Sequence, residues 1–375
     1  MKRSGAEKLV VIMLLLLPVI ALNCGGKSGE GELLLQDFAP RSMLSVDSTV
    51  VLRSKYPSID AHNHLTLWRQ WNRIEQSPAE TIALMDDLNL KAIVNLTFTS
   101  ADSFQAVLDE YDNVYPGRVY SYCHWPLDIV TTERDPAVVA RVIEEDLTRS
   151  FKMGAKGLKI DKRIGLTQLD PDGNLPPVDD PRFDPLWAVP GKFGKPVLIH
   201  VADPVAFFTP INRFNERWEE IGVHPDWSFY GPKFPDHDEL LEQRNRVMAR
   251  HPETIFIGAH VGNYPEKLSY VAQCLDKYPN FYVDISARIA ELGRQPYTAR
   301  KFFIKYQDRI MFATDQVQSE EMFRIHFRFM ETDDEYFDYA PDFYTQGRWK
   351  IYGMYLPDEV LKKVYYGNFM RVGGV

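Results

Sequence analysis

Cysteine is scarce in this chain, and so are the features typical of nucleic-acid-binding proteins. Beyond Cys24, its 375 residues contain only Cys123 and Cys274, far apart in sequence, which is weak support for a disulfide bond. Both stand in apolar surroundings, so we expect buried free thiols. A net charge of −9 and the lack of any basic run argue against a nucleic-acid partner.

The apolar run at residues 9–22 is short for a membrane-spanning helix, which needs about 20 apolar residues. It follows three basic residues, an order typical of an export signal. Cys24 comes directly after it, in Ala21-Leu-Asn-Cys24, which resembles a bacterial lipoprotein signal. The resemblance implies lipidation of Cys24 as the mature N-terminus. Plain secretion and an uncleaved anchor are the alternatives.

These features predict three parts: a signal peptide (1–24), a tether (25–45) and one folded domain (46–375). The expected location is outside the cytoplasm, on a membrane facing the periplasm or the cell surface, or else periplasmic or secreted. Membrane contact is expected only through the lipid anchor. No internal repeat, low-complexity block or interdomain linker follows about residue 45, which favours a single domain.

Eight short apolar runs alternate with helical patterns in the remaining chain. The runs are continuously apolar, as expected for parallel strands covered on both faces. Eight βα units predict an α/β fold of the (β/α)8 TIM-barrel type, although a doubly wound sheet has the same local pattern. The expected strands are 59–64, 91–97, 118–124, 156–161, 197–201, 254–260, 281–286 and 309–314. The expected helices are 81–90, 104–111, 136–153 (ended by Gly154), 186–193, 240–250, 268–277, 298–306 and 357–364.

A long loop insertion, residues 203–250, follows the fifth expected strand. In a barrel it would lie at the face that carries active sites, which predicts a lid or pocket wall. Its aromatic residues could equally form an interface in a homo-oligomer. These residues are Phe207, Phe208, Phe214, Trp218, Trp227, Phe229 and Tyr230.

Residues able to bind a metal follow four of the expected strands. His62 and His64 are two residues apart, so both project from the same face of an extended strand. His200, His260 and Asp315 end the fifth, sixth and eighth strands, and in a barrel these ends share one mouth. Each has a structural alternative: a boundary histidine, or for Asp315 a cap of the next helix through Asp315-x-x-Ser-Glu. Four such coincidences at one end predict a single site.

The motifs around these residues resemble those of the amidohydrolase superfamily. They are Asp60-Ala-His-Asn-His64, Leu198-Ile-His200, Gly258-Ala-His260-Val-Gly, Phe312-Ala-Thr-Asp315 and Tyr366-Gly-Asn-Phe-Met370. Over roughly residues 57–372 the chain is most similar to the amidohydrolase-related branch that includes aminocarboxymuconate-semialdehyde decarboxylase. The resemblance implies a (β/α)8 barrel and one divalent metal, commonly zinc. The ligands it implies are His62, His64, His200 and Asp315, with His260 beside the attacking water or the substrate.

The chemistry of these residues agrees with that assignment. Three neutral imidazoles and one carboxylate leave a zinc site with net positive charge, which can lower the pKa of bound water from about 15.7 toward 7. Asp315 could accept that water's proton, and His260 could polarise the scissile carbonyl or hold the hydroxide. Asp203 could orient His200 as a hydrogen-bonding carboxylate.

Three further residues are candidates for substrate contact. Lys159, on the fourth strand, could line the pocket beside Asp161, bridge two metals as a carboxylated lysine, as in binuclear members of the superfamily, or simply be solvated. Arg288 could hold a substrate carboxylate through two hydrogen bonds, or form a surface ion pair. His124 could contact the substrate or be structural.

The favoured function is an exported metal-dependent hydrolase in which water attacks an amide, ester or lactone of a small molecule. A nonhydrolytic decarboxylase (a lyase) on the same site is the alternative, and Arg288 holding a carboxylate would favour it. A surface lipoprotein that binds without catalysis is the third hypothesis, against which the convergent ligand set argues. The substrate itself is not indicated by the sequence.

Overall fold

The expected signal peptide, including Cys24, and most of the expected tether lie outside the part of the chain that the structure describes. The chain divides into two units, residues 1–45 and residues 46–375. No helix within the described ranges is long and apolar enough to cross a membrane. The structure is a computed structural model and describes residues 34, 40–70, 76–340 and 346–375.

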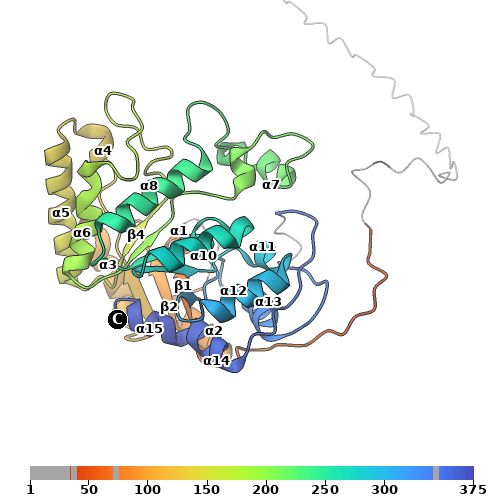
Figure 1. Cartoon of the computed structure of the whole chain (residues 1–375). Helices are drawn as coiled ribbons and strands as arrows, with labels where there is room; N and C mark the ends of the chain where they lie inside the picture. Colours follow the sequence, from red (N-terminus) through yellow and green to blue (C-terminus); the bar gives the residue numbers. More distant parts are fainter. Residues whose placement is uncertain (1–33, 35–39, 71–75, 341–345) are drawn as a thin grey trace, which may run out of the picture. The chain divides into compact units, whose positions relative to one another are not determined.

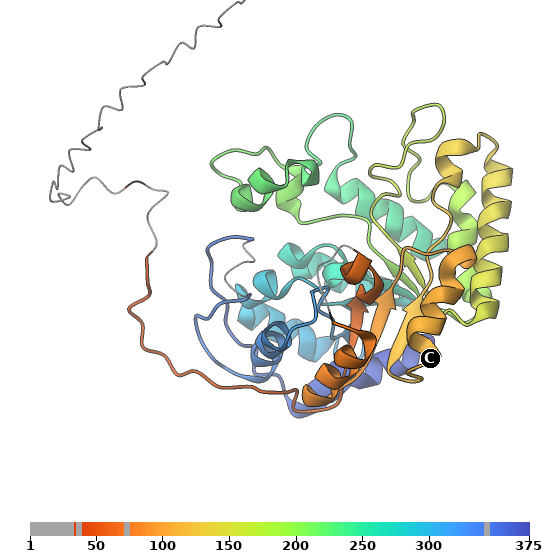
Figure 2. The same ribbon diagram turned by 180° about the vertical axis from the view of Figure 1, so that it is seen from behind.

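The eight expected strands are present in the second unit, and every pairing between them is parallel (Figures 1 and 2). They form two runs, β1-β2-β3 and β4-β5-β6-β7-β8. Their bounds are β1 Ser58–Asn63, β2 Leu90–Leu96, β3 Val119–Tyr122, β4 Leu158–Ile160, β5 Val197–Ile199, β6 Phe256–Gly258, β7 Phe281–Asp284 and β8 Ile310–Met311.

Backbone hydrogen bonds join these two runs at both seams. After β3, the amide of Cys123 donates to the carbonyl of Gly157, just before β4, at 2.9 Å. At the other seam, the amide of Ala61 in β1 donates to the carbonyl of Phe312, just after β8, at 3.0 Å. The strands therefore follow one another around a (β/α)8 barrel, which confirms the predicted fold.

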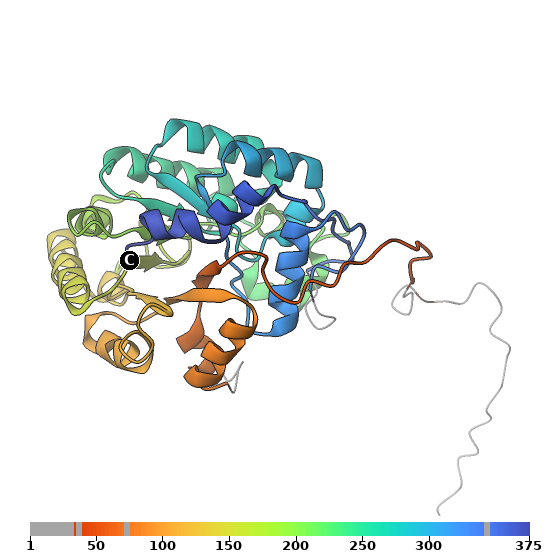
Figure 3. The ribbon, with the colours of Figure 1, turned by 90° about the horizontal axis from the view of Figure 1, so that it is seen from below.

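Helices lie around the outside of the strands (Figure 3). Helix α5 has its expected bounds because both ends carry strong signals. The Asp135 side chain accepts a hydrogen bond from the amide of Ala137, Pro136 is the first residue, and Gly154 (φ 122°) ends the helix. The helices are α1 Leu65–Gln70, α2 Pro78–Asp87, α3 Ala101–Val107, α4 Ile129–Thr132, α5 Pro136–Met153, α6 Asp184–Lys192, α7 Trp218–Val223, α8 His237–Arg250, α9 Ala259–Gly262, α10 Leu268–Lys277, α11 Ile289–Gly293, α12 Pro296–Lys305, α13 Glu320–Glu331, α14 Asp358–Lys362 and α15 Asn368–Val372.

The predicted insertion after β5 contains α7 and ends in α8. Of its aromatic side chains, Phe207 and Phe229 are buried, whereas Phe214, Trp218 and Tyr230 are exposed. The buried rings anchor the insertion to the barrel, and the exposed rings leave both of its predicted uses open, as a pocket wall and as an interface. Cys123 and Cys274 are buried free thiols, as predicted.

Candidate metal centre

His62 and His64 lie at the end of β1, and the Nδ1 atom of each ring forms a hydrogen bond that fixes the ring. Nδ1 of His62 lies 2.9 Å from Oδ2 of Asp284, and Nδ1 of His64 lies 2.8 Å from the carbonyl oxygen of Leu96. A carbonyl or an ionised carboxylate can only accept, so Nδ1 carries the hydrogen in both rings. The lone pair is then on Nε2, and this neutral form is the one that binds metals.

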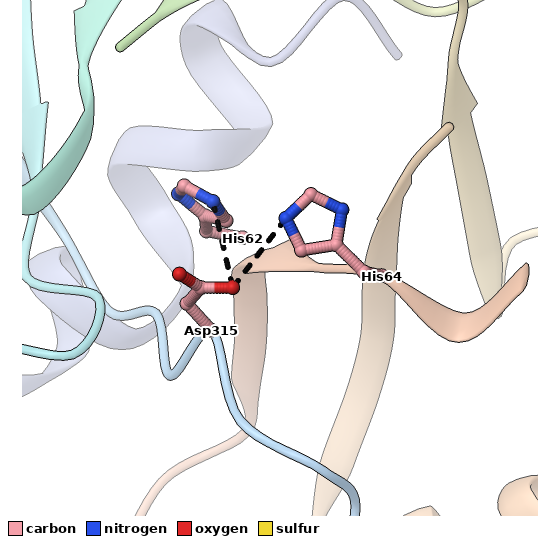
Figure 4. Close-up of side chains that lie close together, drawn as sticks. All are labelled: His62, His64 and Asp315. Atoms are coloured by element: carbon pink, nitrogen blue, oxygen red, sulfur yellow. Dashed lines mark ion pairs between the residues drawn. The ribbon is translucent and has the colours of Figure 1, made fainter. Parts of the chain in front are cut away.

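Asp315 faces both histidines from the end of β8. Its Oδ1 lies 3.4 Å from Nε2 of His64 and 3.9 Å from Nε2 of His62 (Figure 4). One ligand atom from each of these three residues lies within 4.8 Å of the other two, so the group could hold one ion. The alternative that Asp315 caps the next helix is wrong, because Ser319 caps α13 by accepting from the amide of Met322.

His260, at the end of β6, approaches the same carboxylate from another side. Its Nδ1 donates to the carbonyl of Ser286 at 2.8 Å, which again puts the lone pair on Nε2. That Nε2 lies 3.8 Å from Oδ2 of Asp315, whereas His62 and His64 face Oδ1. The two oxygens of one carboxylate therefore face different groups.

His200, the fourth predicted ligand, lies next to His260, with ring centroids 4.4 Å apart. It is not a member of the three-residue group above. Its Nε2 lies 3.2 Å from Oδ1 of Asp203, the residue expected to orient it, and Asp203 also pairs with Lys162. This leaves Nδ1 as the nitrogen through which His200 could bind a metal, and its ligand role stays a prediction.

Two buried aspartates that the sequence reasoning missed organise the site. Asp284, at the end of β7, accepts from His62 and, through its other oxygen, from the amide of His260 at 3.0 Å. Asp60 accepts from the amide (2.9 Å) and hydroxyl (2.6 Å) of Thr314, which joins β1 to β8. Both end or lie in buried strands, the same signal that identified the histidines.

Lys159 lies inside the barrel, 2% exposed, with Nζ 3.4 Å from Nε2 of His62. Its ammonium therefore faces the lone pair that a metal would use. Burial lowers the pKa of Lys159 to about 8, against the opposing effect of nearby carboxylates, Asp315 first. Asp161, its expected partner, instead accepts from Arg163 at 2.8 Å.

His124 and Arg288 flank the site in different ways. Nε2 of His124 lies 2.8 Å from Asp161 and its Nδ1 2.9 Å from the carbonyl of Trp125, so both nitrogens are engaged. Its ring is buried and stacks on Phe98 and on Trp125, so its role in substrate contact stays a prediction. Arg288 is 6% exposed and forms no ion pair within the described residues; its Nη1 donates to the carbonyl of the preceding residue. Its Nε is buried without a hydrogen-bond partner.

Burial also sets the charge of the candidate ligands. It lowers the pKa of His64 to about 3 and of His200 to about 4, and it lowers those of His62 and His260 well below 6.5. It raises the pKa of Asp315 to about 7. Neutral imidazoles and a carboxylate that is only 21% exposed fit a divalent cation, because the cation would offset the cost of withdrawing that carboxylate from solvent. The donor set matches the nitrogen and oxygen ligands of zinc.

Comparisons with known proteins agree with this geometry. A family model described as amidohydrolase matches residues 59–372. Among solved structures, 2,6-dihydroxybenzoate decarboxylase complexed with 2,6-dihydroxybenzoate is similar at 17% identity and a TM-score of 0.53, over 85% of this chain and 100% of that one. A putative amidohydrolase from Staphylococcus aureus is 18% identical, with a TM-score of 0.51 over 85% and 99% of the two chains. These likenesses show a shared fold, and no curated protein sequence matches the chain.

Proposed function

This chain belongs to the amidohydrolase family, and from that membership we propose that it is a metal-dependent hydrolase acting on an amide, ester or lactone of a small molecule. The observation that supports the metal most directly is the convergence of the Nε2 lone pairs of His62 and His64 on the carboxylate of Asp315. Three ligand atoms within 4.8 Å of one another could hold a single ion, which supports the proposal.

We propose one zinc or similar ion, held by His62, His64 and Asp315, with His200 as the fourth ligand through Nδ1. When bound, such an ion acts as a Lewis acid and activates water for attack. The hydrogen bonds that Nδ1 of His62 and Nδ1 of His64 donate to Asp284 and to the carbonyl of Leu96 keep both rings in the binding tautomer.

The positions of the two oxygens of Asp315 suggest that one binds the metal and the other transfers the proton. Oδ1 faces His62 and His64, so Oδ2, 3.8 Å from Nε2 of His260, is the oxygen available for proton transfer. Asp315 would accept the proton of the attacking water and return it to the leaving group. His260 would hold that water or polarise the scissile carbonyl from the same side.

Arg288 indicates the kind of substrate. Its guanidinium is buried and its charge acts on Glu220 and Glu266, but no carboxylate within the described residues forms an ion pair with it. We propose that Arg288 binds a carboxylate of the substrate and that Lys159 and the ring of His124 line the same pocket. This feature also favours the second candidate function, nonhydrolytic decarboxylation, in which the held carboxylate is the group released.

Asp315→Asn tests the hydrolytic proposal, because the amide keeps a metal-binding oxygen but cannot accept the proton of the attacking water. We expect it to lower turnover by at least about a hundredfold while much of the metal stays bound. Asp146→Asn, a buried aspartate outside the site, is the matched control and should keep turnover. Activity would be screened on amides, esters, lactones and carboxylated aromatics, with separate assays for acid and carbon dioxide release.

The outcomes distinguish the hypotheses. Acid release that depends on Asp315 supports hydrolysis. Release of carbon dioxide instead supports the second candidate function, decarboxylation. Purified protein that binds no metal, or an Asp315→Asn variant with full activity, would overturn the proposed mechanism. A chain that binds ligands but turns over none of them would favour the non-catalytic lipoprotein.

We also propose export and lipidation at Cys24, since a basic segment and a short apolar run precede that cysteine. Cells expressing the chain would be fed labelled palmitate. Label incorporated by the natural chain and lost in Cys24→Ala supports the anchor, whereas unlabelled protein in the medium or periplasm supports plain secretion.

A further inference from the structure

His260 lies in a turn whose backbone is left-handed at four consecutive residues. The φ angles are 56° for His260, 59° for Val261, 64° for Gly262 and 61° for Asn263. L-residues avoid this region because the side chain crowds the backbone, and a β-branched valine avoids it most strongly. Such strain persists only where the surroundings hold it in place, and it is concentrated at functional sites.

Two buried side chains of α8 hold the far end of this turn. Nη1 of Arg244 donates to the carbonyl of Gly262 at 2.5 Å, and Nε2 of His237 donates to the carbonyl of Asn263 at 3.0 Å. The side chain of Asn263 in turn accepts from the amide of Val201 at 3.2 Å. The turn is thus attached to α8 and to the residue that follows His200.

Arg244 is an unusual residue for this position. It is 1% exposed and forms no ion pair within the described parts of the chain. Its other direct partners are the side-chain oxygen of Asn245 at 3.0 Å, the sulfur of Cys274 at 4.0 Å and the ring of Phe281, whose centroid lies 5.0 Å from the guanidinium. The charge of Glu242 also acts on it, without an ion-pair contact. Burial lowers the pKa of Arg244, which reflects the cost of placing a cation there. A neutral, well-packed side chain at this position would avoid that cost. The presence of an arginine therefore suggests that its hydrogen bond to Gly262 has a role.

We propose that Arg244 is a positioning residue for His260: its hydrogen bond to Gly262 holds the left-handed turn that aims Nε2 of His260 at Asp315. The near end of the turn is held by Asp284 and Ser286, which bind the amide and Nδ1 of His260. With both ends held, the imidazole has one orientation. The inference rests on the role proposed above for His260, and it adds a residue that does not touch the substrate.

The first test does not depend on activity. In 15N-histidine-labelled protein, the ring signals of His260 would be identified by their loss in His260→Gln. Arg244→Met keeps the approximate volume and removes the donor, so the His260 signals should shift or broaden. Asn245→Ala removes a neighbouring partner of Arg244 but leaves the bond to Gly262, and it should leave the His260 signals in place. Equal changes in both variants, or none in Arg244→Met, would overturn the proposal.

The second test uses whichever substrate the activity screen identifies. At equal metal content and below its unfolding temperature, Arg244→Met should lower kcat by about tenfold to a hundredfold with little change in KM, since a small misplacement of a positioned group has that effect. Arg244→Lys, which can still donate to Gly262, should recover part of the loss. If Arg244→Met does not fold, His237→Phe removes the other donor and should shift the same His260 signals. Normal kcat together with unshifted His260 signals in a folded Arg244→Met variant, or in a folded His237→Phe variant where Arg244→Met does not fold, contradicts the proposal.

The two tests also separate this inference from the proposed function. A wild-type protein without any turnover would contradict the enzymatic proposal while the histidine signals still report on the turn. Shifted signals with unchanged kcat would mean that Arg244 orients the ring but that His260 takes no part in turnover.

Discussion

Nε2 of His64 lies 3.4 Å from Oδ1 of Asp315, across the seam where β8 meets β1. The seam itself brings them together: the amide of Asp315 donates to the carbonyl of His62 at 2.8 Å, and Thr314 binds Asp60. The first and last strands of the barrel therefore contribute one site, and closing the barrel also assembles the candidate ligands.

Replacing Lys159 with methionine should tighten metal binding. Its ammonium lies 3.4 Å from the His62 nitrogen that a metal would use, so the two cations compete for one place. Even in water, two unit charges about 4 Å apart repel by about 1 kcal/mol, and a divalent ion doubles this effect. Affinity for zinc, measured by competition with a chelator, should rise at least about tenfold in Lys159→Met.

The same variant tests the binuclear alternative. If Lys159 were a carboxylated bridge, the natural protein would hold two metals and Lys159→Met would hold at most one, with weaker binding. A stoichiometry of one metal in both proteins, with higher affinity in the variant, contradicts the bridge.

Asp284→Asn should weaken metal binding by about tenfold to a hundredfold, the usual effect of removing a carboxylate that orients a ligand histidine. The amide can present its nitrogen to Nδ1 of His62, which would favour the wrong tautomer. Isothermal titration with zinc measures the change. Asp146→Asn, which alters a buried aspartate elsewhere, should bind zinc as the natural protein does, and equal weakening in both would remove the proposed role of Asp284.

The sequence predicted the barrel well because its strands are continuously apolar and its major helices carry end signals. Residues 136–153 and 268–277 form helices with the predicted bounds. Helix α13 was not predicted, although it has twelve residues. The signal was present in the sequence, because its buried side chains recur at helical spacing and Ser319 precedes the helix as its cap. The buried residues are Met322, Phe323, His326, Phe327, Phe329 and Met330.

The candidate site was predictable only in part, for a physical reason. A residue at the end of an apolar strand can be placed from sequence, and His62, His64, His260 and Asp315 do meet. The orientation of each ring depends on the partner of its Nδ1 atom. For His62 this partner is Asp284, on a strand far along the chain. The left-handed turn of His260 was likewise invisible, because Val261 is a residue that disfavours it.

The insertion after β5 is fixed to α11 by a buried charge cluster, which predicts a large effect on stability. Arg217, 1% exposed, binds Glu220 at 2.6 Å and also Glu291 of α11. Arg217→Met would leave two buried carboxylates without their cation, and removing one partner of a buried ion pair costs about 3–5 kcal/mol. The free energy of unfolding, from urea titration, should fall by about that amount.

Arg141→Met is the matched control, because Arg141 forms an exposed ion pair with Glu145 on the surface of α5. Exposed pairs contribute about 0–1 kcal/mol, so this variant should unfold within that range of the natural protein. If the Arg217 variant were equally stable, the insertion would not depend on the cluster for its attachment.

His326 should make the protein less stable in mild acid. Its Nδ1 donates to the carbonyl of Met322, its Nε2 is buried without a hydrogen-bond partner, and burial lowers its pKa to about 4. Above pH 6.5 the ring is neutral in both the folded and the unfolded chain. As the pH falls toward 4, the unfolded chain gains a proton that the folded chain excludes, so stability is lost over that window. Between pH 7 and pH 5 the loss from this one residue should be about 2 kcal/mol.

His326→Phe lacks the titrating group, so its free energy of unfolding should fall less than that of the natural protein over the same interval. Between pH 7 and pH 8 the difference between the two proteins should stay constant, and parallel curves down to pH 5 would show that His326 is protonated without cost in the folded state.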